Sequence, residues 1–160
     1  MDLILWRHAE AQDHPDPVNG LPGDAQDLAR RLTPRGEKQA ARMAAWLDRQ
    51  LPEGARVFAS PAQRCEQTAV ALGRKFKLRD ELLPEADALA VLELAQWPDG
   101  KGPVVVVGHQ PTLGQVIARL LALPEEDCPM KKGAVWWLRQ RERNGQLQTV
   151  IVTVQTPELL

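Results

Sequence analysis

The chain has 160 residues, with 20 lysines and arginines against 21 aspartates and glutamates, a formal net charge of −1. This length predicts one domain spanning residues 1–160, and the balanced charge provides no basic surface for nucleic acid or an anionic membrane. No apolar run has the length of a signal-peptide core or a membrane span, and Cys65 and Cys128 form no CxxC pair. We therefore expect a cytoplasmic protein with reduced thiols.

Three short apolar runs predict buried strands: LILW at 3–6, RVFAS at 56–60 and PVVVVGH at 103–109. Each run is continuous rather than alternating, which is typical of parallel strands covered on both faces. A weaker pattern predicts a short strand at 79–82. The loop over residues 12–27, rich in proline, glycine and aspartate, is the segment we expect to be mobile.

Helical patterns lie between and after these runs. Three of them begin with residues that favour a helix start, namely Thr33-Pro34, Ser60-Pro61 and Pro111. The predicted helices span residues 33–51, 60–76, 86–96 and 110–123.

The C-terminal part, from AVWW to TVQ, predicts two strands joined by a tight turn at Asn144-Gly145. Alternating strands and helices predict an α/β fold: a layered sandwich whose mostly parallel sheet has helices on both faces and ends in this C-terminal hairpin.

Charged and polar side chains follow all three apolar strands. Arg7-His8 ends the first, Ser60 and Arg64 follow the second, and His109 ends the third. Because ligands bind outside the carboxyl ends of parallel strands, we expect these side chains to share one rim. Two guanidiniums can grip a phosphoryl group, and an imidazole in line with the leaving group can attack it. The sequence therefore predicts phosphoryl-transfer chemistry.

Four segments in this order, LWRHAEA, LTPRGEKQA, FASPAQRCEQTA and VVVVGHQPTLG, resemble the histidine phosphatase superfamily, and most closely its SixA-type phosphohistidine phosphatase branch. The resemblance implies that His8 is a nucleophile that becomes transiently phosphorylated. It also implies phosphate binding by Arg7, Arg64 and His109, with no metal or other cofactor. Ala9 stands where much of the superfamily has glycine, so the backbone there must have an ordinary φ.

The proton donor to the leaving group is less well marked. Larger members of the superfamily use an acidic residue, and Glu85 is the candidate by motif position; it can equally be an acidic residue at a helix N-terminus. Glu10 is closer in sequence but nearer the phosphate. His14, seven residues after Arg7, is either a further phosphate donor or a solvated loop residue. We assign Ser60 and Thr68 structural roles, as a helix cap and as packing beside the site.

The expected function is that of a phosphatase acting through a phosphohistidine enzyme intermediate, with phosphohistidine in a protein as the leading substrate. A small phosphorylated metabolite as substrate, or a non-catalytic phosphate-binding module, are the alternatives. A metal hydrolase is disfavoured because HAEAQDH matches neither HxHxDH nor HExxH and places Arg7 beside the ligands. Lys131 and Lys132 form either a basic lip to the site or a solvated turn.

Overall fold

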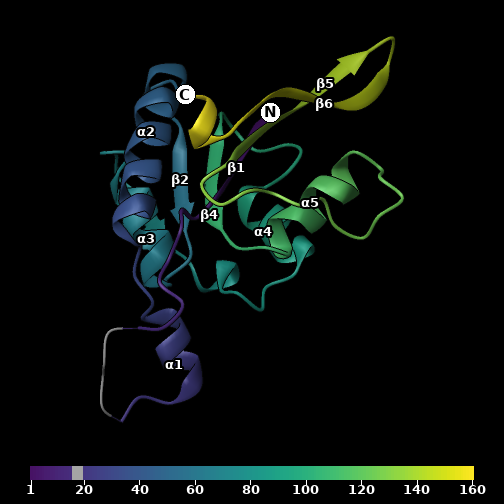
Figure 1. Cartoon of the computed structure of the whole chain (residues 1–160). Helices are drawn as coiled ribbons and strands as arrows, with labels where there is room; N and C mark the ends of the chain where they lie inside the picture. The colour runs from purple at the N-terminus through teal and green to yellow at the C-terminus, as the bar shows by residue number, and fades with distance from the viewer. Residues whose placement is uncertain (16–19) are drawn as a thin grey trace.

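A sheet in the strand order β3-β2-β4-β1-β5-β6 forms the middle layer of the protein (Figure 1). The structure is a computed structural model and describes residues 1–15 and 20–160. The strands are β1 (Asp2–Arg7), β2 (Arg56–Ala59), β3 (Lys77–Leu78), β4 (Val104–Gly108), β5 (Val135–Arg143) and β6 (Gln146–Gln155). The first four strands pair in parallel, and β5 and β6 add an antiparallel hairpin beside β1. The predicted α/β fold with a mostly parallel sheet and a C-terminal hairpin is confirmed.

Helices cover both faces of this sheet (Figure 1). They are α1 (Gly23–Leu28), α2 (Pro34–Gln50), α3 (Gln63–Val70), α4 (Ala88–Ala95) and α5 (Thr112–Leu120), with short 3₁₀ turns η1 (Asp80–Leu82) and η2 (Pro157–Leu159). The helices α2 and α3 pack on one face, and α4 and α5 pack on the other. This arrangement gives the sheet two separate apolar cores.

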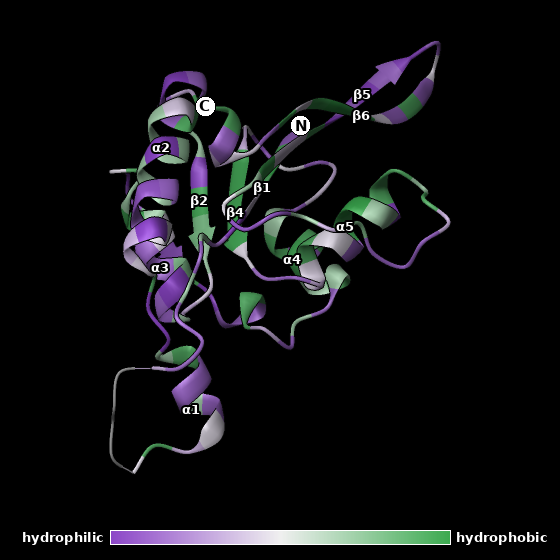
Figure 2. Ribbon diagram, in the orientation of Figure 1, coloured by the Kyte–Doolittle hydropathy of each residue, from purple (hydrophilic) through white to green (hydrophobic). Residues whose placement is uncertain are grey.

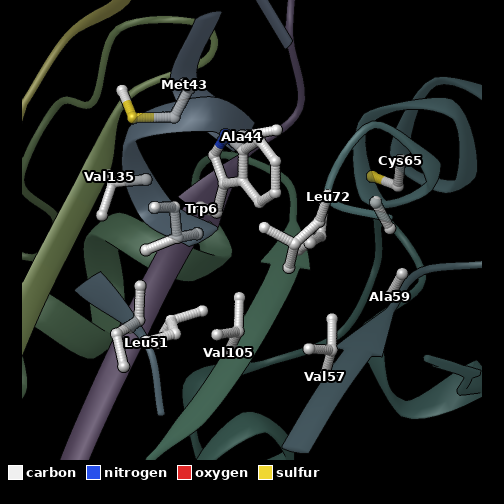
Figure 3. Close-up of a cluster of buried hydrophobic side chains, with 14 of the residues drawn as sticks. Trp6, Met43, Ala44, Leu51, Val57, Ala59, Cys65, Leu72, Val105 and Val135 are labelled. Atoms are coloured by element: carbon white, nitrogen blue, oxygen red, sulfur yellow. The ribbon is translucent and has the colours of Figure 1, made fainter. Parts of the chain in front are cut away.

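Alternate residues of each central strand enter opposite cores. Ile4 and Trp6 of β1 pack beneath α2, whereas Leu3 and Leu5 pack against α4 and α5. Figure 3 shows the first core, with the Trp6 indole beneath Met43 and Ala44 of α2. A central strand whose two faces are both buried must be apolar on both. The neighbouring strand β4 follows the same rule: all five of its residues are buried, and its ribbon is hydrophobic in Figure 2.

The start of α2 brings the helix against the segment that follows β1. Thr33 caps the helix by accepting a hydrogen bond from the Gly36 amide at 2.9 Å, and Pro34 occupies the first helical position, as predicted. A side chain at Gly36 would collide with the backbone carbonyl of Glu10. Gly36 thus allows the start of α2 to pack directly against the segment that follows β1, close to His8.

Some of the predicted strand and helix boundaries were wrong. Residues 79–82 do not form a strand: pairing with β2 ends at Leu78, because β2 itself ends at Ala59, and the chain turns into η1. The helix predicted over 60–76 is confined to α3, and the unpredicted α1 overlaps the end of the loop predicted over 12–27. Residues 16–19, part of that predicted loop, lie outside the described residues. In the described part of the chain, no helix is long and apolar enough to cross a bilayer.

Candidate active site

A cavity of about 270 Å³ opens where β1, β2 and β4 end. A larger hollow of about 630 Å³ lies elsewhere, between residues 55–58 and 74–77, but the smaller one collects the predicted chemistry. Its lining residues are Arg7, His8, Ala11, Asp13, Arg30, Arg64, Pro84, His109, Gln110 and Lys132. Four side chains predicted from three separate segments are therefore brought to one cavity.

His8 is held in one tautomer by the backbone. Its Nδ1 lies 2.7 Å from the carbonyl oxygen of Ala9, which can only accept a hydrogen bond, so Nδ1 carries the proton. The other nitrogen, Nε2, forms no hydrogen bond with any residue that the structure describes. The neutral ring therefore presents a lone pair at Nε2.

Burial keeps this imidazole neutral. Only 7% of His8 is exposed, and desolvation lowers its pKa from 6.5 to about 3, with further lowering from His109, Arg64 and Arg7, against an opposing effect of the Ala9 hydrogen bond. The ring is thus a free base at neutral pH, which is the form that a nitrogen nucleophile needs.

The backbone around His8 is fixed from three sides. Its amide donates to the Gly108 carbonyl at 3.1 Å, and its carbonyl accepts from Gly133 at 2.9 Å. The amide of Ala9 donates to Thr68 Oγ1 at 3.1 Å, so Thr68 has the structural role expected of it. Ala9 is not among the residues with positive φ, which explains why alanine is tolerated there.

Two guanidiniums flank the imidazole, each with an unused donor. Arg7 donates from Nη1 to the Met130 carbonyl at 2.6 Å, and Arg64, 3% exposed, reaches the cavity from α3. The Nε atoms of both arginines are buried and have no hydrogen-bond partner among the described residues. Because unpaired buried donors are costly, this pair indicates a site built for an anion.

A carboxylate that sequence analysis missed holds one of these arginines. Asp27 accepts from Arg64 through its backbone oxygen at 2.8 Å and through Oδ2 at 3.2 Å, while its Oδ1 accepts from Arg30 Nε at 3.0 Å. Burial opposes ionisation of Asp27, but Arg64 and Arg30 lower its pKa overall. Asp27 therefore fixes the Nη fork of Arg64 and brings a third arginine, Arg30, to the cavity wall.

His109 has partners at both ring nitrogens. Nδ1 lies 3.4 Å from Arg64 Nη2, a pure donor, so Nε2 carries the proton and donates to Ser60 Oγ at 2.8 Å. Desolvation, followed by the charge of Arg64, lowers the His109 pKa to about 3. Ser60 is not the helix cap that we expected, because α3 begins three residues later, at Gln63; it orients His109 instead.

Two of the predicted site residues, Glu85 and His14, lie outside the cavity wall. Glu85 is exposed, and its neighbour Pro84 lines the cavity in its place; His14 is also exposed and does not line it. The carboxylate that does line the cavity is Asp13. Lys132 lines the cavity as well, whereas Lys131 does not, and both lysines are exposed.

The sequence of this chain is similar to known phosphatases. The sequence model of the histidine phosphatase superfamily (branch 1) matches residues 3–91. Phosphohistidine phosphatase SixA of Escherichia coli (strain K12) is 35% identical over 138 residues, which cover 81% of this chain and 79% of the relative. The phosphohistidine phosphatase SixA homolog of Haemophilus influenzae is 27% identical over 135 residues, covering 75% of this chain and 77% of the relative.

Similarity in three dimensions extends over the whole chain. A solved structure of the protein histidine phosphatase SixA complexed with tungstate has a TM-score of 0.77 at 28% identity, with 99% of both chains covered. The matched segments include the Arg7-His8 pair that ends β1 and delivers an imidazole to the cavity. The chain therefore belongs to the histidine phosphatase superfamily, in its SixA-type branch, and is a phosphatase.

Proposed function

We propose that this phosphatase removes phosphate from phosphohistidine in a protein and carries the phosphoryl group transiently on His8. The observation that supports this most directly is the hydrogen bond from His8 Nδ1 to the Ala9 carbonyl, which leaves Nε2 as an unprotonated nucleophile in the cavity. The depressed pKa of His8 supports the same role, because the ring needs no base to activate it.

The reaction has two displacements at phosphorus. In the first, the Nε2 lone pair of His8 forms a bond to phosphorus as the bond to the substrate imidazole breaks, and that imidazole, which is already protonated at its other ring nitrogen, leaves as the neutral base. In the second, water attacks the phosphorus, the bond to Nε2 breaks, and inorganic phosphate departs. Arg7 and Arg64 bind the non-bridging oxygens throughout and stabilise the charge of each transition state. His109, which lines the same cavity, contributes a further contact to the phosphoryl group.

Phosphohistidine is the substrate favoured by the chemistry of the cavity. A protonated imidazole is a good leaving group, so the reaction makes a small demand on an acid catalyst. The lining includes one carboxylate among the described residues, Asp13, and that group is exposed. The names of the relatives point to the same substrate class. We infer that Lys132 and Arg30, which line the cavity, contact the protein that carries the phosphohistidine.

A rapid-quench experiment tests the proposal. The protein is mixed with a radiolabelled phosphohistidine protein and denatured in alkali within one turnover, and the retained label is mapped by peptide. We expect acid-labile, base-stable label on the peptide that contains His8, and none in His8→Ala. His14→Ala is the matched control, because that histidine is exposed and outside the cavity; it should be labelled like the parent protein.

Other outcomes separate the alternatives. Release of phosphate without trapped label, under conditions that resolve a single turnover, would favour direct attack by water. Binding of inorganic phosphate with no release from any substrate would indicate a non-catalytic binding module. Turnover of small phosphate esters far faster than of the phosphohistidine protein would move the substrate to a metabolite.

A further inference from the structure

The two edges of the sheet differ in how they are protected. At one edge, β3 is only two residues long and carries Lys77. At the other, β6 is ten residues long, and its sequence, QLQTVIVTVQ, contains no charged residue, proline or glycine. Proteins normally protect an exposed edge with short strands, lysines or prolines, because unpaired backbone groups recruit another strand. The first edge follows this rule and the second does not.

Half of the β5–β6 hairpin also projects beyond the rest of the sheet (Figure 1). Pairing of β5 with β1 ends at Arg139, opposite Asp2, whereas the hairpin continues to its turn at Asn144-Gly145. Two strands without further support are marginally stable in water. We call residues 140–151 the arm: the projecting part together with Val150 and Ile151, which lie opposite the last two residues of β5 that pair with β1. It exposes 67% of Leu147 and 48% of Ile151.

One hydrogen bond shows which backbone groups of the arm point away from the protein. The amide of Gln140 donates to the Met1 carbonyl at 2.9 Å, so Gln140 faces β1. Because backbone direction alternates along a strand, the neighbours on either side of Gln140 face β6. By the same alternation Arg143 also faces β6, and in the observed register Arg139, Arg141 and Arg143 lie opposite Val150, Gln148 and Gln146. The residues of β6 whose N–H and C=O groups point away from the protein are therefore Leu147, Thr149 and Ile151.

We propose that two copies of the chain associate through this edge, with their β6 strands antiparallel and Thr149 opposite Thr149 of the partner subunit. A twofold axis perpendicular to the sheet keeps the faces of both strands aligned, so opposite residues must share a face. With Thr149 on the axis, Leu147 lies opposite Ile151 of the partner subunit. Leu147, the most exposed apolar residue of the arm, thus covers Ile151 of the partner subunit, which is also exposed.

The backbone of the edge fits this register. All three outward residues are matched with outward residues, and each such pair exchanges two hydrogen bonds. Over residues 146–151 the β5–β6 register is regular, and its one irregularity falls beyond the arm, between Trp137 and Leu138. A strand without charge suits a second copy of itself, since no like charges oppose one another. The pairing turns two isolated ribbons into a four-stranded sheet.

Proline at the centre of the interface gives a sharp test. Thr149→Pro removes the N–H that faces the partner but leaves every bond to β5, as prolines on edge strands do. Its control is Thr149→Ala, which loses the same side-chain hydrogen bond to Gln140 but keeps the N–H. Sedimentation velocity of the full chain, from micromolar to several hundred micromolar, should show a species of twice 17.8 kDa for the parent protein and Thr149→Ala. Thr149→Pro should remain at 17.8 kDa throughout.

A charge provides a second, independent variant. Ile151→Lys places a lysine on each copy within the pairing and should also halve the mass. Leu89→Lys is its control, because Leu89 on α4 has the same exposed fraction of 48% and lies outside β6. Circular dichroism verifies that all variants are folded. A parent protein that stays at 17.8 kDa at every concentration, or a dimer that survives Thr149→Pro, overturns the proposal. Neither outcome depends on the phosphatase activity.

Discussion

The two histidines of the cavity lie close together but have different hydrogen-bond partners. Their ring centroids are 5.5 Å apart and the rings are tilted by 59°. His8 uses one nitrogen on a backbone carbonyl and has the other available, whereas His109 has both engaged, by Ser60 and Arg64. A phosphoryl group can therefore meet His8 without breaking a hydrogen bond, but must displace a partner of His109. This difference supports His8 as the nucleophile.

Two carboxylates compete for the role of acid catalyst. Asp13 lines the cavity and Glu85 does not. We expect Asp13→Asn to lower kcat by about 10²-fold on an alkyl phosphate, whose alkoxide needs a proton, and by far less on phosphohistidine. Glu85→Gln should leave both rates near the parent values. Steady-state kinetics on the two substrates provide the measurement, and a large loss in Glu85→Gln alone would return the acid role to Glu85.

Residues that follow the strand ends could be predicted, and Asp27, which lies in α1, could not. Arg7, His8, Arg64 and His109 follow parallel strands, so the topology of the sheet is enough to bring them together. Asp27 reaches Arg64 across 37 residues of sequence, and only the folded path of the α1 segment creates that contact. Polar pairs formed by loop packing leave no periodic signal in a sequence.

At the level of elements, α2 determines where the segment after β1 lies. Thr33 caps the helix and also donates from its hydroxyl to Glu10 Oε2 at 2.7 Å. The contact between Gly36 and the Glu10 backbone then leaves no room for a side chain. Glu10 is thus fixed by the helix start, and one of its carboxylate oxygens is engaged by the Thr33 hydroxyl.

Adding one methyl group at this contact should be costly. In Gly36→Ala the new Cβ meets backbone atoms, which cannot rotate away, so we expect the free energy of unfolding to fall by about 2 to 3 kcal/mol. Gly54→Ala is the control, because a Cβ there has open space and the backbone φ is ordinary; its stability should change by less than about 1 kcal/mol. Urea denaturation compares the two. Equal stabilities would show that α2 can shift without cost.

Element boundaries were predictable where local chemistry defines them. The start of α2 coincides with its Thr-Pro signal, and the turn at Asn144-Gly145 has both residues at positive φ. The strand predicted over residues 79–82 failed because a strand exists only where a neighbour can pair with it. Its neighbour β2 ends at Ala59, a limit that lies in a distant part of the sequence.

Over the whole molecule, the buried neutral histidines make stability depend on pH. The unfolded chain takes up protons near the ordinary histidine pKa of 6.5, whereas folded His8 and His109 do so only at about 3. The unfolded state therefore binds more protons between these values. The contribution of the histidines is complete above pH 6.5 and declines as the pH falls below it.

Each histidine should lower the free energy of unfolding by up to about 1.4 kcal/mol per pH unit below about pH 6. His8→Asn should remove one of these two contributions and flatten the dependence accordingly. Urea denaturation at a series of pH values down to about 4.5 measures both slopes. Identical slopes for the parent protein and the variant would mean that folded His8 titrates like a histidine in water.

The place of β1 in the sheet also sets the order in which the protein can be assembled. This strand leads directly to His8, the proposed nucleophile, and precedes the other strands of the sheet in the chain, yet its neighbours are β4, from Val104, and β5, from Val135. Its apolar residues must wait for most of the chain to emerge from the ribosome before either edge is paired. Contacts so distant in sequence slow folding and leave the strand open to aggregation or chaperone binding meanwhile. Catalytic competence is therefore acquired late in biosynthesis, once the C-terminal hairpin has closed the second side of β1.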